Sequence, residues 1–66
     1  MLYKKLRVKM LEEETSISKL SRDINISRQW LSRVFNGKKD FSESLKSKIA
    51  ECLGIAEEDI PIFFEK

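Results

Sequence analysis

Residues 16–37, SISKLSRDINISRQWLSRVFNG, decide the fold of this chain because they carry two helical patterns separated by a sharp break. Ile17, Leu20 and Ile24 stand three and four residues apart, which is the spacing of one face of an α-helix. Ser16 is a preferred N-cap residue and comes directly before this pattern. The sequence therefore predicts a short helix that runs to about Ile24.

A turn and a second helix follow at once. Asn25 is one of the few non-glycine residues that enter the left-handed conformation at low cost, so it predicts a tight turn. Ile26 is expected to return to the core, and Ser27 is expected to cap a helix over about residues 28–36. Gly37 is expected to end that helix in the left-handed conformation.

One more helix is predicted on the N-terminal side, over about residues 2–13. Leu2, Leu6 and Met10 stand four apart and Tyr3 lies seven before Met10, so these side chains share one apolar stripe. Three successive glutamates near the end of this helix point around the cylinder rather than toward one another. They are therefore interpreted as a solvated helix end and not as an acid–base cluster.

The C-terminal part predicts a fourth helix and one short turn. Ser42 is the expected cap of this helix and Gly54 its expected end. Residues 56–60 look like a single helical turn with an acidic start, and Pro61 is expected to end it. The fourth helix carries an apolar stripe at helical spacing: Leu45, Ile49, Cys52 and Leu53.

Length and composition predict one domain, over residues 1–66, of the all-α class. Only two glycines and one proline interrupt the chain, and no apolar alternation at period two is present. Cys52 is the sole cysteine, so it forms no disulfide within the chain and is interpreted as a core filler rather than a redox thiol. The N-terminus lacks the pattern of a signal peptide and no stretch approaches about 18 apolar residues, so a cytoplasmic protein is expected.

Charge is distributed unevenly along the chain. Residues 1–39 carry ten basic and four acidic side chains, a net charge of +6, whereas residues 40–66 carry three basic and seven acidic ones, a net charge of −4. Such a domain can offer one face to a polyanion. A charge run is also typical of an ordinary solvated helix face, so the charge pattern alone leaves both interpretations open.

The helix predicted over residues 28–36 separates its side chains sharply. At about 100° per residue, the apolar side chains fall on one arc and the polar ones on the other, and the polar arc contains no acidic residue. Arginine can form two hydrogen bonds with guanine and glutamine can pair with adenine in the major groove. The absence of acid suits a surface that lies against phosphates. The polar arc consists of Arg28, Gln29, Ser32, Arg33 and Asn36.

With these features, residues 16–37 resemble the helix-turn-helix of the phage repressor and Cro (Xre) family. Apolar residues occupy the family's packing positions, namely Leu20, Ile24, Ile26, Leu31 and Val34. The resemblance extends over most of the chain and implies a compact bundle of about five short helices, a lambda-repressor-like DNA-binding domain. It also implies sequence-specific binding of double-stranded DNA by a transcriptional regulator of phage or mobile-element type, either a repressor or a Cro-like protein.

The resemblance assigns roles to individual residues. The family reads bases with the second helix of the motif in the major groove. Base-reading positions then fall on Arg28, Gln29, Arg33, Ser27, Ser32 and Asn36. Phosphate contacts fall on Ser16 and Ser18 at the start of the first motif helix and on Lys38 and Lys39 after the second. Trp30, on the border between the two arcs, is expected to pack half-buried rather than to contact DNA.

The chain departs from the family pattern at three positions. Ile17 stands where the family commonly has a phosphate-holding glutamine, so Ser16, Ser18 or backbone amides must take over that contact. Ser21 replaces the small alanine at the contact of the two helices, which is a mild change. Asn25 replaces the glycine of the turn, and its backbone preferences permit this.

The last part of the chain leaves two interpretations open. Ile62, Phe63 and Phe64 either fold back over the N-terminal helix or form the contact of a homodimer. A dimer is expected at least on DNA, because a single recognition helix covers only a few base pairs. The two copies would then meet half-sites about 34–36 Å apart or a multiple of that. The rival function is a small helical protein-interaction module, such as an antitoxin or a recruitment subunit.

An enzyme is not expected, because the chain has no histidine, no paired thiols and no glycine-rich phosphate loop. For the same reasons no catalytic residue, metal site or cofactor is predicted. No small-molecule ligand is expected because there is no pocket-forming domain, and no membrane association because there is no long apolar stretch.

Overall fold

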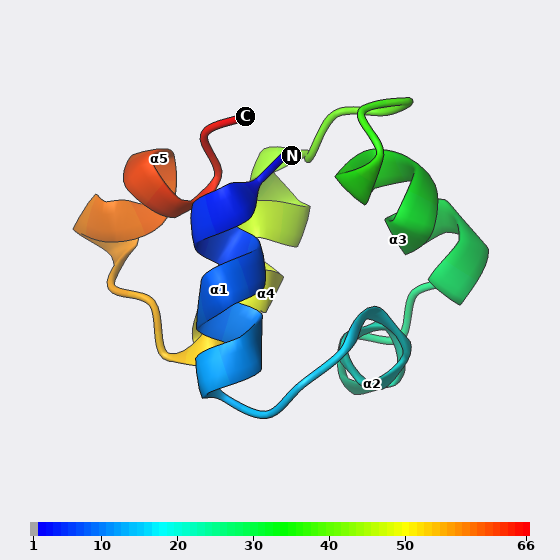
Figure 1. Cartoon of the computed structure of the whole chain (residues 1–66), viewed down its shortest axis with the longest axis horizontal. Helices are drawn as coiled ribbons and strands as arrows, with labels where there is room; N and C mark the ends of the chain where they lie inside the picture. The colour runs from blue at the N-terminus through cyan, green and yellow to red at the C-terminus, as the bar shows by residue number, and fades with distance from the viewer. Residues whose placement is uncertain (1) are drawn as a thin grey trace.

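Five α-helices and one short 3-10 turn make up residues 2–66, the part of the chain that this computed structural model describes, and no strand occurs among them. In Figure 1, α2 and α3 lie together at one end of the longest axis and α5 lies at the other, with α1 between them. The predicted all-α fold of about five short helices is confirmed. The elements are α1 (Lys4–Glu12), α2 (Ile17–Asp23), α3 (Arg28–Phe35), α4 (Glu43–Leu53), η1 (Glu57–Asp59) and α5 (Ile60–Phe63).

The first helix begins later than the sequence pattern predicts. Tyr3 adopts a left-handed conformation, with φ 56°, and α1 starts only at Lys4. Leu2 therefore lies outside the helix and is exposed, so its expected place in the apolar stripe of α1 was wrong. The turn at Tyr3 instead buries the Tyr3 ring among other aromatic side chains.

Three serines start three of the helices as predicted. Each hydroxyl accepts a hydrogen bond from the backbone amide three residues later, which satisfies one of the free N–H groups of the first turn. The bond is 3.2 Å from Lys19 N to Ser16 Oγ, 3.3 Å from Trp30 N to Ser27 Oγ and 3.1 Å from Leu45 N to Ser42 Oγ.

Left-handed residues end the four longer helices. In each case the amide just beyond the left-handed residue donates to a carbonyl five residues earlier, at 2.8–2.9 Å, which is the Schellman arrangement. Asn25, Gly37 and Gly54 were expected in this role and occupy it. Glu14, with φ 55°, does the same after α1 although its sequence carries no such signal.

Four aromatic rings form the centre of the core. Neighbouring rings meet edge to face, with centroids 4.9–6.0 Å apart, an arrangement that aromatic pairs prefer. The rings come from both ends of the chain and from the region around α3. Through this cluster both terminal segments pack against the end of α3. Its members are Tyr3, Phe35, Phe41 and Phe64.

The C-terminal apolar residues divide between the core and the surface. Phe64 is 7% exposed and belongs to the core, whereas Ile62 is 49% exposed and Phe63 is half-buried. Pro61 does not end a helical turn, contrary to the sequence-based expectation. It lies in the first turn of α5, where its missing N–H would have had no helical partner. No helix among residues 2–66 is long and apolar enough to span a membrane.

Candidate nucleic-acid interface

The outer face of α3 is polar and free of acidic side chains. Arg28, Gln29, Arg33 and Asn36 are exposed, and Ser32 is half-buried. The opposite arc packs into the core through three residues that are at most 1% exposed: Leu31, Val34 and Phe35. The buried arc therefore holds the helix while the polar arc faces outward, and Trp30 is half-buried at the border, as predicted.

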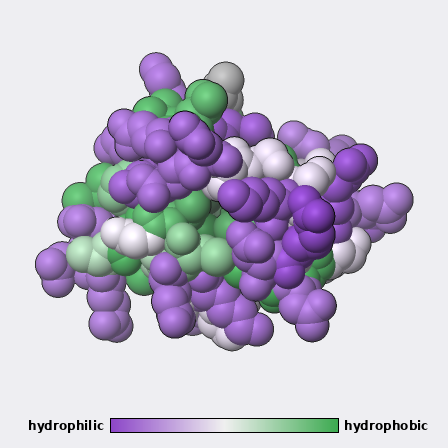
Figure 2. Space-filling model, turned by 90° about the horizontal axis from the view of Figure 1, so that it is seen from below, coloured by the Kyte–Doolittle hydropathy of each residue, from purple (hydrophilic) through white to green (hydrophobic). Residues whose placement is uncertain are grey.

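The cationic side chains of this face have no acidic partner in the described residues. The ion pairs within residues 2–66 are Lys9–Glu13 at 3.5 Å, Lys46–Glu43 at 3.7 Å and Lys66–Asp40 at 3.0 Å, all elsewhere in the fold. Figure 2 shows mainly hydrophilic surface on the side of the molecule where α2 and α3 lie. The positive charge of α3 is thus available to an external anion.

The starts of α2 and α3 are joined by side chains. Arg28 Nη1 donates to Ser18 Oγ at 3.3 Å, and Ser27 and Ser16 cap the two helices. The structure therefore brings a predicted base-reading arginine next to Ser18, a predicted phosphate contact. Ser16 and Ser27 are exposed and Ser18 is half-buried.

The family departures in α2 have clear structural consequences. Ile17 packs partly buried against the core and its side chain has no polar atom, so it cannot replace the glutamine amide. Ser21 is 5% exposed, and its hydroxyl donates to the Ser18 carbonyl at 2.8 Å, so the buried polar group is satisfied.

The turn after α3 carries the other two predicted phosphate contacts. Lys38 and Lys39 are both exposed and follow Gly37, whose φ is 81°. The next residue, Asp40, accepts a hydrogen bond from Lys66 Nζ at 3.0 Å. This hydrogen bond and the charge of Asp40 raise the pKa of Lys66. Lys66 thereby pairs with the charge of Asp40, the acidic residue next in sequence to Lys38 and Lys39.

Sequence reasoning missed the role of Arg7. Its guanidinium lies at the C-terminal end of α3, where Nη2 donates to the Phe35 carbonyl at 3.1 Å. The two residues are 28 positions apart, so neither periodicity nor a local motif could indicate the contact. The clustering of basic residues in positions 1–39 was the only signal.

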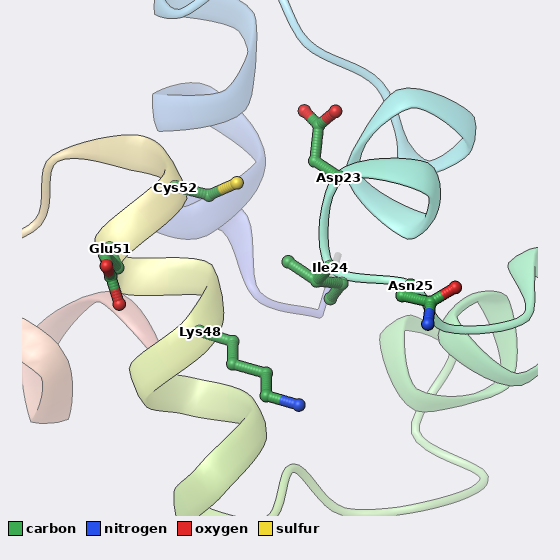
Figure 3. A pocket seen from close by; sticks show the side chains of 6 residues that line it. All are labelled: Asp23, Ile24, Asn25, Lys48, Glu51 and Cys52. Atoms are coloured by element: carbon green, nitrogen blue, oxygen red, sulfur yellow. The ribbon is translucent and has the colours of Figure 1, made fainter.

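A cleft between α2 and α4 is lined by side chains of mixed character and holds Cys52 (Figure 3). Cys52 is exposed, so its predicted place in the core was wrong, and Ala50 occupies the buried stripe of α4 instead. Partial burial, followed by the charges of Asp23 and Glu51, raises the pKa of the thiol. The thiol therefore stays protonated and is a poor nucleophile.

Comparison with known proteins places this geometry in a family. No curated protein and no solved structure matches the chain. The family model described as the Cro/C1-type HTH DNA-binding domain matches residues 5–66, which include all five helices except the start of α1. The chain therefore belongs to the Cro/C1-type helix-turn-helix family of DNA-binding domains.

Proposed function

We propose that this protein binds double-stranded DNA at specific sequences by placing α3 in the major groove, and that it acts as a transcriptional regulator. The observation that carries the proposal is the outer arc of α3, where Arg28 and Arg33 are exposed and meet no acidic partner among residues 2–66. A helix fits the major groove, and arginine is the side chain that most often reads guanine there.

Each polar residue of the arc has a chemical role in this proposal. Arg28 and Arg33 donate to guanine, Gln29 pairs with adenine, and three smaller side chains complete the readout: Ser27, Ser32 and Asn36. Phosphates on either side of the groove are held by the start of α2 and by the turn after α3. The residues proposed for these contacts are Ser16, Ser18, Lys38 and Lys39.

Occupation of a regulatory site by such a domain blocks other proteins from the same DNA, so we propose a repressor or Cro-like regulator of phage or mobile-element type. Its partner is DNA, and we expect it in the cytoplasm. Selection of bound duplexes from a random pool tests the function. We expect an enriched motif, with log affinity falling linearly with log salt at about −0.9 per contacted phosphate. Recovery of unbiased sequences would contradict specific recognition.

We further propose that two copies associate on DNA through the surface between α1 and α5. A groove there is lined by Val8, Ile62 and Phe63 and bordered by lysines of α1. Val8 and Ile62 are 46% and 49% exposed, and Figure 2 shows hydrophobic surface gathered on this side of the molecule. Phe64 is excluded from the interface because it is buried in the core.

Charge and dimensions both favour a second copy as the occupant of this groove. The groove has a lysine border, Lys4, Lys5 and Lys9, and η1, which directly precedes α5, carries three acidic residues. We propose that a self-complementary two-fold contact pairs these unlike charges. α5, which forms one wall of this groove, lies at the opposite end of the longest axis from α3, and the Cα atoms span 27 Å along that axis (Figure 1). Each α3 must lie about 17–18 Å from a two-fold axis to meet adjacent half-sites, which this length allows.

Replacing Ile62 with glutamate is expected to abolish the dimer, because the new carboxylate would lie in the centre of the apolar contact. Leu11→Glu is the matched control: Leu11 is 76% exposed and does not line the groove. Sedimentation with a duplex carrying two half-sites should give two protomers per duplex, bound cooperatively, for the parent and for Leu11→Glu. Independent binding of single protomers is expected for Ile62→Glu. Unchanged cooperative binding by Ile62→Glu would rule out this interface.

A further inference from the structure

The side chain of Arg7 connects α1, the N-terminal segment and the end of α3. Nη2 donates to the Phe35 carbonyl at 3.1 Å, and Nε donates to the Leu2 carbonyl at 2.8 Å. The guanidinium also stacks over the Phe35 ring, with its carbon 5.2 Å from the ring centroid. Three different interactions thus converge on one half-buried side chain.

Arg7 completes the C-terminal end of α3. The last four carbonyls of a helix have no partner within the helix. The carbonyls of residues 32, 33 and 34 accept the amides of residues 36, 38 and 37, at 2.9–3.1 Å. The fourth carbonyl, that of Phe35, accepts the hydrogen bond from Arg7. A cation at this end is also favoured by the helix dipole.

The hydrogen bond lies at the end of α3 that is farther along the chain from its link to α2. The backbone of α3 packs mainly against α2, which precedes it in the chain. At its C-terminal end, α3 is attached by Phe35 and Arg7. Arg7 therefore holds the C-terminal end of α3 together with the buried Phe35 ring.

The same side chain also supports the turn that carries Lys38 and Lys39. By holding the Leu2 carbonyl, Arg7 places Leu2 against Gly37. A Cβ atom at Gly37 would lie only 2.7 Å from Leu2 Cδ1, which shows how closely the two segments approach. One guanidinium thus contacts both the end of α3 and the segment that packs against the turn after it.

We propose that Arg7 is a positioning residue for DNA readout: it makes no contact with DNA and fixes the orientation of α3 on which base recognition depends. The inference rests on the proposed function. Base contacts need side chains placed within about 0.5 Å and 10–20° of their working geometry, whereas phosphate contacts by flexible lysines tolerate more. Loss of Arg7 therefore reduces discrimination between sequences more than it reduces general attraction to DNA.

The test compares Arg7→Met and Arg7→Lys with the parent on two duplexes, the motif selected from the random pool and a scrambled version of it. Arg7→Met retains much of the apolar stem, and Arg7→Lys also retains the charge but cannot bridge both carbonyls in the same way. Lys48→Met, an exposed change on α4, controls for the loss of one positive charge. Thermal unfolding of each variant gives the folded fraction used to correct the affinities.

For Arg7→Met we expect about a tenfold loss of affinity for the selected duplex, the equivalent of one hydrogen bond from a charged donor. Affinity for the scrambled duplex and the salt slope should stay at the parent's values. Arg7→Lys should give a smaller loss on the selected duplex only, which keeps the test valid if Arg7→Met does not fold.

Two results would overturn the proposal. If both duplexes lose affinity equally and the salt slope falls by about 0.9, Arg7 holds a phosphate. If the variants unfold more easily while their folded fraction keeps the parent's discrimination, Arg7 is a structural residue only. A parent that does not distinguish the two duplexes would instead refute the proposed function, and the role of Arg7 with it.

Discussion

Replacing Phe64 with alanine is expected to lower the free energy of unfolding by about 3–5 kcal/mol, the usual cost of emptying a buried phenylalanine site. The Phe64 ring is 7% exposed and meets Phe41 edge to face at 5.1 Å. A chain of this length has a total stability of only about 3–10 kcal/mol. Much of the Phe64→Ala protein should therefore be unfolded even without denaturant.

Ile62→Ala, two residues away, is the matched control for this prediction. Ile62 is 49% exposed, so its truncation should change stability by less than about 1 kcal/mol. Urea unfolding followed by far-ultraviolet circular dichroism measures both variants. Equal urea midpoints for Phe64→Ala and Ile62→Ala would mean that Phe64 is not a core residue.

Replacing Arg28 with alanine is expected to cost about 1–3 kcal/mol of binding free energy on the selected DNA motif and to relax base preference at one position. Arg28 is exposed at the start of α3, and its hydrogen bond to Ser18 is a surface contact of 3.3 Å. The fold should therefore remain intact, because surface interactions of this kind contribute little to stability. Repeating the selection with the variant identifies the relaxed position.

Lys38→Ala separates base contacts from phosphate contacts. Lys38 is exposed in the turn after α3, so its loss should weaken binding to all sequences alike and reduce the salt slope by about 0.9. If Arg28→Ala behaved in the same way as Lys38→Ala, with equal losses on the selected and the scrambled duplex, Arg28 would be a phosphate contact and not a base reader.

The helices and their ends were largely predictable because their causes are local. The spacing of Ile17, Leu20 and Ile24 reports one face of a helix. A capping serine such as Ser27 acts on an amide only three residues away. The left-handed end at Glu14 could not be foreseen, because glutamate has no preference for that conformation.

The sequence-based predictions were wrong where the burial of a side chain depended on parts of the chain far away in sequence. Cys52 has the spacing of a buried residue on α4, but α2 does not cover it, so it faces the cleft. Phe64 and Ile62 are both hydrophobic, but Phe64 packs against Phe41 and is buried whereas Ile62 stays exposed. Such assignments require the packed structure.

In the candidate DNA-binding site, too, the features with local causes were predictable from the sequence and those that depend on distant residues were not. The polar arc of α3 follows from sequence because one helix presents it, and the structure leaves Gln29 and Arg33 exposed with no acidic residue on that arc. The support by Arg7 involves α1, the N-terminal segment and α3 together. The helix-turn-helix segment, residues 16–37, does not include Arg7, so its sequence alone could not indicate the proposed role of this residue.

The proposed function requires the outer arc of α3 to meet the bases. Backbone amide chemical shifts, recorded as the selected duplex is added to the isotope-labelled protein, test it most directly. We predict the largest changes in residues 27–39 and at the start of α2, with small changes along the exposed face of α4. Changes concentrated on α4 or in the groove between α1 and α5, with α3 unaffected, would show that α3 is not the DNA-binding element.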